Sequence, residues 1–257
     1  EHYVLDEILI TARRKPENSD TVPVTVRAFD QENLRELSIN TTLDLQQTVS
    51  GVFLGGSGSR SNTLYSIRGQ GQPVIGQGSP GVVTYFADVP LPNGANAVPQ
   101  YDVDNIQVLK GPQGTLFGRN TVGGAILTYP AAPTYNVEGY LQIAGTNYDG
   151  HFAQGALNLP IVDEKLAVRL AGQYQKRSGY TENLGNGNDQ DDLDSKSARL
   201  SVLFQPTEAF KNLTVVDYHK TDTASSGAIL DHASPVPIAA NTFARFDILA
   251  VEQSVLG

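Results

Sequence analysis

The sequence lacks cysteine, methionine and tryptophan altogether. Without cysteine the chain can form no disulfide, offers no thiolate nucleophile and supplies no sulfur ligand to a metal. It also has no initiator Met and no charged-then-apolar signal segment at its start. We therefore expect a processed form or an excised piece of a longer chain rather than a primary translation product.

Basic side chains are few, with 18 Lys and Arg against 27 Asp and Glu and a net charge of −9. Because nucleic-acid phosphates are bound by clustered Lys and Arg, this composition argues against a nucleic-acid partner. The sequence also lacks any run of about 20 apolar residues, which excludes a helical membrane protein. A membrane β-barrel is compatible with the mean hydropathy of −0.23, since its strands alternate apolar and polar residues.

Up to Pro130, short apolar runs are separated by connections rich in Gly and Pro. Such connections predict turns, and the runs between them are too short for most helices. Asp30 predicts the cap of a helix that runs to Leu37, and Thr41 with Asp44 predicts the start of a second helix. The expected strands cover residues 21–26, 65–68, 82–87, 106–109 and 125–129. Together these elements predict a small α+β domain with a mixed sheet.

After Pro130 the sequence changes to longer segments that alternate strictly between apolar and polar residues. On a strand over residues 166–175, Leu170 and Tyr174 point to one side, while Arg169 and Gln173 point to the other. The same alternation recurs over residues 137–143 and 198–204. This half is therefore predicted to form strands with one apolar and one polar face.

The connections between these strands are short at residues 160–164 and 205–212 and long at residues 178–194. A soluble β-sandwich and a membrane barrel both contain alternating strands. Strand lengths near the ~9–11 residues that cross a bilayer, with short turns at one end and long loops at the other, favour the barrel. About five or six strands fit after Pro130, whereas a bacterial barrel has at least ~8, so the chain cannot close one alone.

Two segments resemble the TonB-dependent outer-membrane receptor family. The first is similar to the TonB box of that family and is followed by basic residues at 13–15. A short apolar peptide of this kind can lie extended and add as a strand to a sheet edge of a periplasmic partner. Its residues are Asp6, Glu7, Ile8, Leu9, Ile10, Thr11 and Ala12.

The second segment, residues 103–126, resembles the plug signature of the same family. There a strand ends in a Lys-Gly-Pro turn, passes a Gly-rich bend and returns through Gly-Gly into a final strand. We expect the glycines to permit positive φ or close backbone approach where the plug fits a barrel wall. An Ile-Arg-Gly element at 67–69 fits the family, and residues 85–90 match its Tyr-x-Asp-Gly-Val-Pro element except for a missing Gly. The signature residues are Arg68, Gly69, Lys110, Gly111, Pro112, Gly114, Gly118, Arg119, Gly123 and Gly124.

The resemblance implies an α+β plug domain followed by antiparallel transmembrane β-barrel strands. It divides the chain into a TonB box and periplasmic segment at 1–20, a plug at 21–130 and the N-terminal part of a barrel at 131–257. The chain is then expected to be a fragment, a truncated gene product or an incompletely described chain. The implied function is energised uptake across the bacterial outer membrane, with the TonB C-terminal domain, outer-membrane lipid and a small-molecule substrate as partners.

The substrate that the resemblance implies is most often a ferric siderophore, with cobalamin, a saccharide or an aromatic compound as alternatives. Plug apices at residues 55–62 and 71–79 are the expected contacts, because Gly, Ser and Gln there give polar, adaptable surfaces. The candidate substrate residues are Ser57, Ser59, Arg60, Gln72 and Gln77.

No enzyme motif is complete in the sequence, so we expect no catalytic residue, no cofactor and no metal site. A dinucleotide-like Gly69-Gln70-Gly71 lacks its third Gly, and the four histidines have no metal-ligand spacing. The acidic run at 188–194 does not fit a calcium-loop template and predicts a solvated loop.

Asp102 and Asp104 are the nearest carboxylate pair for a glycoside hydrolase and are expected to share a strand face. Lys110 and Arg119 are expected to pair with barrel-wall carboxylates, and Arg68 to be an ion-pair partner within the plug. Two alternatives to the receptor stay open: a soluble β-rich binding or structural module, and a non-functional receptor fragment.

Overall fold

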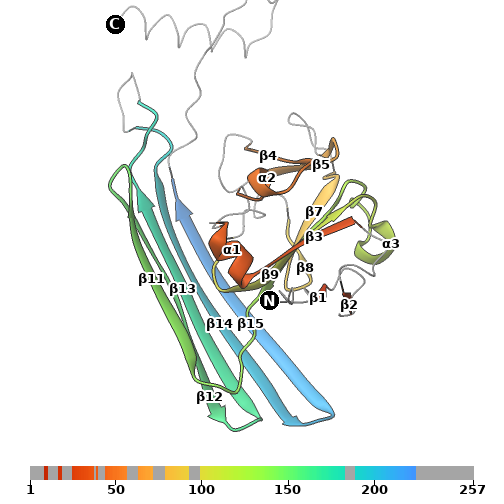
Figure 1. The fold of residues 1–257 in the computed structure, drawn as a ribbon, viewed down its shortest axis with the longest axis vertical. Helices are drawn as coiled ribbons and strands as arrows, with labels where there is room; N and C mark the ends of the chain where they lie inside the picture. The colour runs from red at the N-terminus through yellow and green to blue at the C-terminus, as the bar shows by residue number, and fades with distance from the viewer. Residues whose placement is uncertain are drawn as a thin grey trace, which may run out of the picture.

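The computed structural model describes residues 9–10, 17–18, 25–37, 39, 44–56, 63–71, 79–92, 99–182 and 189–223. They form a small N-terminal domain that lies beside a tall antiparallel sheet, which we call the wall sheet (Figure 1). Within the described part of the chain, no helix is long and apolar enough to cross a membrane.

The N-terminal domain contains a five-stranded mixed sheet in the order β3-β9-β10-β7-β8. β10 runs parallel to β7 and antiparallel to β9, so the sheet is mixed as predicted. Its strands are β3 (Thr25–Asp30), β7 (Val82–Phe86), β8 (Val89–Pro90), β9 (Val103–Lys110) and β10 (Gly124–Pro130).

Smaller elements surround this sheet. A second sheet has the order β4-β5-β6, and a separate pair of short strands joins β1 to β2. The remaining elements are β1 (Leu9–Ile10), β2 (Glu17–Asn18), β4 (Val52–Gly56), β5 (Thr63–Ile67), β6 (Gln70–Gly71), α1 (Gln31–Glu36), α2 (Leu45–Thr48) and α3 (Gly114–Phe117).

Apolar side chains cover both faces of the mixed sheet. On one face Ile106, Val108 and Ile126 pack into a cluster with residues of the α1, α2, β4 and β5 regions. On the other face Leu109 and Leu127 pack with a smaller cluster that includes residues of β7 and α3. Because both faces are buried, the central strands are apolar at successive positions instead of alternating.

Local capping positions the first helix as the sequence predicts. Asp30 Oδ1 accepts a hydrogen bond of 2.8 Å from the backbone N–H of Asn33, and α1 begins at the next residue after Asp30. The second helix begins at Leu45, but Asp44 makes no side-chain cap bond, and Thr41 lies outside the described residues. The strand expected to end at Val26 continues as β3 to Asp30.

The wall sheet consists of five antiparallel strands in chain order. Alternation sets its two faces: Arg169 and Gln173 are buried against the N-terminal domain, whereas Leu170 and Leu200 are exposed on the outer face. The predicted period-two pattern is therefore present, with the polar face inward. The strands are β11 (Glu138–Thr146), β12 (Gly150–Val162), β13 (Leu166–Arg177), β14 (Leu193–Thr207) and β15 (Phe210–Asp222).

The two ends of the wall sheet differ in their connections. Tight turns join β12 to β13 and β14 to β15 at one end, and the long connection between β13 and β14 lies at the other. At that same end, however, β11 and β12 are joined by a short turn in which Tyr148 and Asp149 have φ of 61° and 50°. Two consecutive residues with positive φ are typical of the tightest hairpin turns. The β11–β12 connection is therefore short, although it lies at the long-loop end of the wall sheet.

Gly124 is the glycine whose replacement we expect to be most costly. Its φ is +148°, and an added Cβ would lie 2.1 Å from the carbonyl oxygen of Leu109 on the paired strand β9. We expect Gly124→Ala to lower the free energy of unfolding by roughly 2–4 kcal/mol, because the β9–β10 ladder must separate to admit the methyl group.

Denaturant unfolding of the purified protein in detergent measures this effect. The matched control is Gly114→Ala, because an added Cβ at this helical position meets no atom within 4 Å. We expect the control to be neutral or stabilising by up to about 1 kcal/mol. Equal losses in the two variants would contradict the steric explanation.

Candidate functional site

The glycine-rich segment after β9 folds back on its own domain. The N–H of Gly111 donates to the carbonyl of Gly123 over 2.9 Å, and the N–H of Gly123 donates to the carbonyl of Gly81 over 2.7 Å. The hydroxyl of Tyr85 donates to the carbonyl of Phe117 over 2.6 Å, which fixes α3 against β7. Two backbone hydrogen bonds and one side-chain hydrogen bond thus hold the signature turn.

Close backbone approach is present at these glycines as expected, and among the described residues it is to the N-terminal domain itself. A Cβ on Gly123 would lie 2.7 Å from the carbonyl oxygen of Gln70, within the same domain. Gly69, Gly111 and Gly118 have positive φ, as expected of turn glycines, but Gly114 does not, and nothing lies within 4 Å of its added Cβ. Pro112 is exposed beside Gly111.

Three cations, Arg27, Arg68 and Lys110, gather where β3 begins and where β5 and β9 end. Lys110 Nζ donates to the carbonyl of Ser50 over 2.8 Å, and Arg68 Nη2 donates to the hydroxyl of Thr25 over 3.3 Å. Burial lowers the pKa of Lys110, and the charges of Arg68 and Arg27 lower it further. Among the described residues, the hydrogen bonds of Lys110 and Arg68 are therefore with a carbonyl and a hydroxyl. Arg119 is exposed in the turn after α3.

A buried ion pair joins the N-terminal domain to the wall sheet. Asp102, in the segment just before β9, accepts two hydrogen bonds from Arg169 of β13, one of them from Nε over 2.8 Å. The side chains are 1% and 8% exposed, respectively. Asp102 has φ of +47°, a conformation in which only a few non-glycine residues are found, and the bidentate pair holds it there.

A second arginine extends this contact to the next strands. Arg199 of β14 donates to Asp217 of β15 over 2.7 Å and to the carbonyls of Tyr101 and Asp102 over 3.0 and 3.1 Å. Its guanidinium carbon lies 4.4 Å from the ring centre of Tyr101 and 4.8 Å from that of Phe86. The arginine thus touches two wall strands and two segments of the N-terminal domain.

Tyr101 completes the contact, which we call the ion-pair chain (Tyr101, Asp102, Arg169, Arg199 and Asp217). Its hydroxyl donates to Asp217 over 3.0 Å, and its side chain is almost fully buried. Burial raises the pKa of the Tyr101 phenol, and the nearby carboxylate of Asp217 raises it further against the effect of Arg199. The phenol therefore stays protonated at neutral pH and remains a hydrogen-bond donor.

The carboxylate pair considered for a hydrolase does not exist as a pair. Asp102 is buried in the ion-pair chain, whereas Asp104 is exposed and accepts a hydrogen bond of 2.7 Å from Asn105. The expectation that the two share a face is wrong, because positive φ at Asp102 turns the chain before β9 begins.

The acidic run after the long loop is only partly solvated. Asp191 is buried and accepts a hydrogen bond of 2.6 Å from the hydroxyl of Thr181, which corrects the expectation of a wholly solvated loop. Within the described ranges, no group of three or more His, Cys, Asp or Glu side chains is placed to hold a metal ion.

Several predicted site residues lie outside the described part of the chain. Of the expected TonB box, Leu9 and Ile10 form β1 and pair with Asn18 and Glu17 of β2. The other five box residues are outside the described ranges, as are all the candidate substrate residues: Asp6, Glu7, Ile8, Thr11, Ala12, Ser57, Ser59, Arg60, Gln72 and Gln77.

A mixed-sheet domain packed against the polar face of an antiparallel wall is the arrangement of a plug inside the start of a barrel wall. Residues 18–125 match the family model of the TonB-dependent Receptor Plug Domain. Residues 18–125 thus resemble the plug domain of such receptors, and the strands that follow resemble their first barrel strands in fold.

Curated relatives and solved structures agree with this assignment. The chain is 24% identical to the pesticin receptor of Yersinia pestis, in an alignment that covers 71% of this chain and 27% of the receptor. It is 20% identical to the ferripyoverdine receptor of Pseudomonas aeruginosa, in an alignment that covers 85% of this chain and 26% of that receptor. The ferric yersiniabactin uptake receptor from Yersinia pestis matches with a TM-score of 0.67 and 23% identity over 72% of this chain and 29% of that one. The chain thus spans about a quarter of the length of these relatives.

We expect the Asp102–Arg169 contact to be one of the most stabilising in the protein. Asp102→Asn leaves Arg169 buried without a charged partner, so the free energy of unfolding should fall by about 3–5 kcal/mol. Replacing both residues with Leu removes both charges and should cost clearly less than Asp102→Asn alone.

Denaturant unfolding in detergent again provides the measurement. Asp104→Asn is the control, because its carboxylate is exposed and its change should stay within about 0.5 kcal/mol. A Leu-Leu variant less stable than Asp102→Asn would show that hydrogen-bond geometry, not charge pairing, dominates the contact.

Proposed function

We propose that the chain forms the plug and first barrel strands of a TonB-dependent outer-membrane receptor that takes up a scarce substrate actively. The observation that carries the proposal is the two-sided wall sheet, whose polar face packs on the plug and whose apolar face is exposed. A sheet of this kind suits a barrel wall between lipid and a plugged lumen. The proposed boundaries are 1–20 for the TonB box segment, 21–130 for the plug and 131–257 for the barrel part.

We propose that the N-terminal peptide couples the receptor to TonB, which supplies the energy for uptake. Residues 6–12 would bind the TonB C-terminal domain by adding a strand to its sheet. In support, Leu9 and Ile10 are extended and, among the described residues, pair with one short strand, β2. A two-stranded pair of this size is weak in isolation, so its backbone groups can exchange partners.

A ferric siderophore is the substrate class that we propose first. The names of the relatives support it, since they include a ferripyoverdine receptor and a ferric yersiniabactin uptake receptor. Cobalamin is an alternative because a vitamin B12 transporter of Vibrio vulnificus is 23% identical over 47% of this chain, and a saccharide or an aromatic compound are further alternatives. Ser57, Ser59, Arg60, Gln72 and Gln77 stay the proposed contacts. The protein itself makes and breaks no bond in this function.

The cation cluster of the plug has a proposed role as well. Arg27, Arg68 and Lys110 are close enough for the two arginines to lower the pKa of Lys110. We propose that carboxylates of the barrel wall neutralise Lys110 and Arg119, as expected for cations at a plug turn, and that Arg68 is an ion-pair partner within the plug. Arg119, exposed in the neighbouring turn, is available to the same wall.

Ile10→Pro tests the coupling peptide. Proline removes a backbone donor and restrains the peptide, so strand addition to TonB should fail. Uptake of a radiolabelled ferric siderophore by cells that carry the variant receptor should be lost, while binding of the same siderophore to those cells persists. The matched control is Ile10→Val, which keeps the donor and the apolar character and should transport normally.

Two outcomes would count against the proposal. Undiminished uptake by the Ile10→Pro variant would show that residues 6–12 are not the TonB box. Recovery of the protein as a stable soluble monomer without detergent would favour the soluble β-rich module, and membrane insertion without uptake by the unaltered protein would favour a non-functional fragment.

A further inference from the structure

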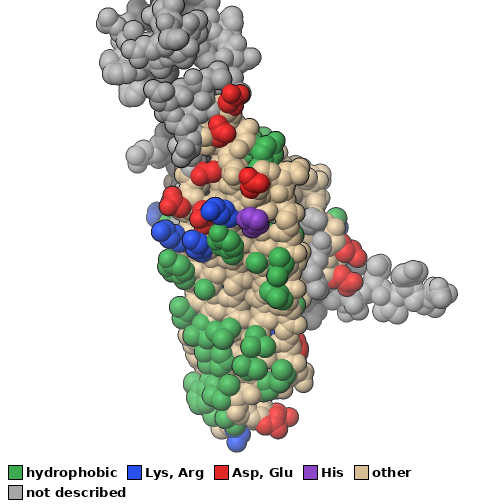
Figure 2. All heavy atoms as spheres, turned by 90° about the vertical axis from the view of Figure 1, so that its left-hand side faces the viewer, with side chains coloured by type: hydrophobic (Ala, Val, Ile, Leu, Met, Phe, Trp, Pro, Cys, Tyr) green, Lys and Arg blue, Asp and Glu red, His purple; other side chains and the backbone are tan. Residues whose placement is uncertain are grey.

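The outer face of the wall sheet carries a continuous apolar band, beyond which charged side chains gather (Figure 2). Its side chains come from alternate positions of all five strands, and Leu141 and Ile143 are each 74% exposed. A surface of this kind suits contact with lipid tails, so the tyrosines within the band need no other explanation. The exposed members of the band are Leu141, Ile143, Leu157, Leu170, Tyr174, Leu200, Phe204, Val216 and Tyr218.

Two further exposed tyrosines, which we call the tyrosine pair, lie beyond the ends of the strands. Tyr148 lies in the turn between β11 and β12 and is 57% exposed, and Tyr180 follows β13 and is 48% exposed. Their ring centres are 5.9 Å apart, with the ring planes tilted by 50°. Tyr148 also has φ of 61°, a conformation that bulky side chains seldom adopt and that Asn or Gly would favour in this turn. Neither lipid contact nor the backbone of the turn therefore accounts for the pair.

A hydrogen bond and a cation–π contact hold the tyrosine pair in place. The N–H of Ser178 donates to the carbonyl of Tyr148 over 2.9 Å. The guanidinium carbon of Arg177 lies 4.8 Å from the ring centre of Tyr180, and its Nη2 donates to the carbonyl of Asp191 over 3.0 Å. Because these contacts fix the two rings in advance, a ligand that stacks on them loses little affinity to the ordering of side chains.

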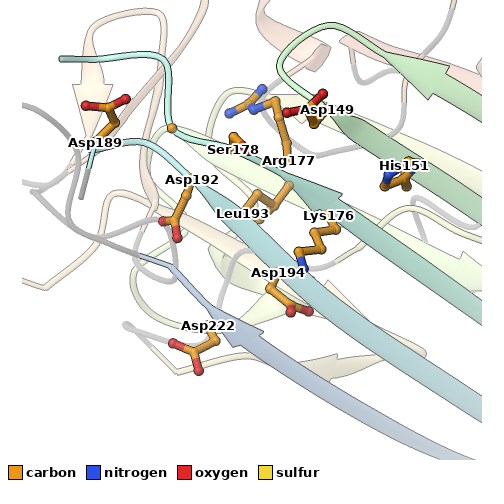
Figure 3. A pocket seen from close by; sticks show the side chains of 11 residues that line it. Asp149, His151, Lys176, Arg177, Ser178, Asp189, Asp192, Leu193, Asp194 and Asp222 are labelled. Atoms are coloured by element: carbon orange, nitrogen blue, oxygen red, sulfur yellow. The ribbon is translucent and has the colours of Figure 1, made fainter.

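An open cleft of about 790 Å³ lies next to this pair (Figure 3). Arg177 and Ser178, which hold the two tyrosines, both line the cleft, as does Asp149, the neighbour of Tyr148. Its volume falls within the range of ~300–1,000 Å³ that is usual for small-molecule sites. Four more lining residues form one register row across β12–β15: His151, Lys176, Asp194 and Asp222.

The lining of the cleft is polar and carries charges of both signs. It contains five aspartates, two cations and one histidine, and the carboxylates are spread along the cleft instead of converging on one point. A metal ion needs convergent ligands, and the described residues place no group of three or more His, Cys, Asp or Glu side chains to hold one. The excess of carboxylates repels an anionic ligand, whereas Lys176 and Arg177 disfavour a purely cationic one. The lining therefore suits a neutral ligand with many donors and acceptors along its length.

We propose that this cleft binds a saccharide, with one sugar ring stacked on the tyrosine pair. Sugar hydroxyls donate to carboxylates and accept from ammonium and guanidinium groups, so one molecule satisfies both kinds of lining group. The C–H face of a sugar ring packs on an aromatic ring, which explains exposed tyrosines beside a polar cleft. The cleft shares no residue with the proposed substrate contacts on the plug, so this site is an addition to the proposed uptake function.

A single tryptophan reports on the site, because the chain has none of its own. Tyr180→Trp keeps a stacking ring beside the cleft. The purified protein is held in dodecyldimethylamine oxide, a detergent without a sugar headgroup, and titrated with maltohexaose, cellohexaose and mannohexaose. We expect at least one of these probes to quench and shift the tryptophan emission saturably. The matched control is Tyr174→Trp, within the apolar band, whose emission should not respond.

Further variants in the Tyr180→Trp background test the geometry. Tyr148→Asn removes the ring but fits the turn, and it should weaken the affinity by about tenfold. Tyr148→Phe keeps the ring and should bind within about twofold of the parent. Asp149→Asn also fits the turn, and it should weaken the affinity by about threefold because a neutral acceptor replaces a charged one.

Dodecyl maltoside distinguishes two sources of the saccharide, because it presents a maltosyl group at a micelle surface. Binding tighter than that of free maltohexaose would assign the cleft to the headgroup of a glycolipid, and weaker binding would assign it to a free saccharide. The proposal would be overturned if none of the three hexasaccharides and dodecyl maltoside changed the emission, or if Tyr148→Asn and Tyr148→Phe bound equally.

A cationic ligand is the competing occupant, and hexalysine is its probe. A response to hexalysine in place of the response to sugars would overturn the proposal and assign the cleft to the carboxylates alone. Siderophore uptake is measured separately on cells that carry the unaltered protein. Its failure would refute the proposed transport function, whereas a silent tryptophan in a protein that transports would refute only this site.

Discussion

The buried charge pairing between plug and wall sheet is the interaction on which the arrangement depends. A charge taken out of water costs several kcal/mol unless it is paired and hydrogen-bonded. Arg169 and Arg199 project from the wall into such a setting, and their charges are balanced by Asp102 of the plug and Asp217 of the wall. Because Asp102 belongs to the plug and Arg169 to the wall sheet, each of the two surfaces alone would carry an unpaired charge.

This pairing also accounts for the distribution of polarity over the wall sheet. The inner face carries polar side chains in hydrogen-bonded rows, such as Gln154, which donates to Gln142 and accepts from Gln173. The outer face has no comparable polar neighbours over most of its height and carries the apolar band. Strict alternation along the five strands therefore places polar side chains on the inner face and apolar side chains on the outer face.

The parts of the structure that depend on neighbouring residues could be predicted from the sequence. The alternation over residues 166–175 and the cap at Asp30 are local, and both are present. The ion-pair chain could not be predicted, because Asp102 and Arg169 meet only through the packing of two separate sheets. The signal in the sequence for this contact was that Arg169 and Arg199 each occupy a polar position of a wall strand. An arginine on a buried face needs a partner.

The errors have a common physical cause. Close backbone approach was expected of the signature glycines at a barrel wall, and among the described residues Gly123 and Gly124 make it with backbone atoms of their own domain. Asp191 was expected in a solvated loop, but the hydroxyl of Thr181 draws it inward. In each case the residue type indicated a close contact or a polar group correctly, while the partner depended on the three-dimensional course of the chain.

The position of β3 determines how the plug responds to a mechanical load. β3 lies at the edge of its sheet and is joined to it by a single ladder with β9, whose first pair is Thr25 with Lys110. Tension that arrives through the chain before Thr25 and pulls across the sheet opens that ladder one pair at a time. β9 itself is anchored next to Asp102, so the plug yields first along its edge while the strands held by the wall stay in place.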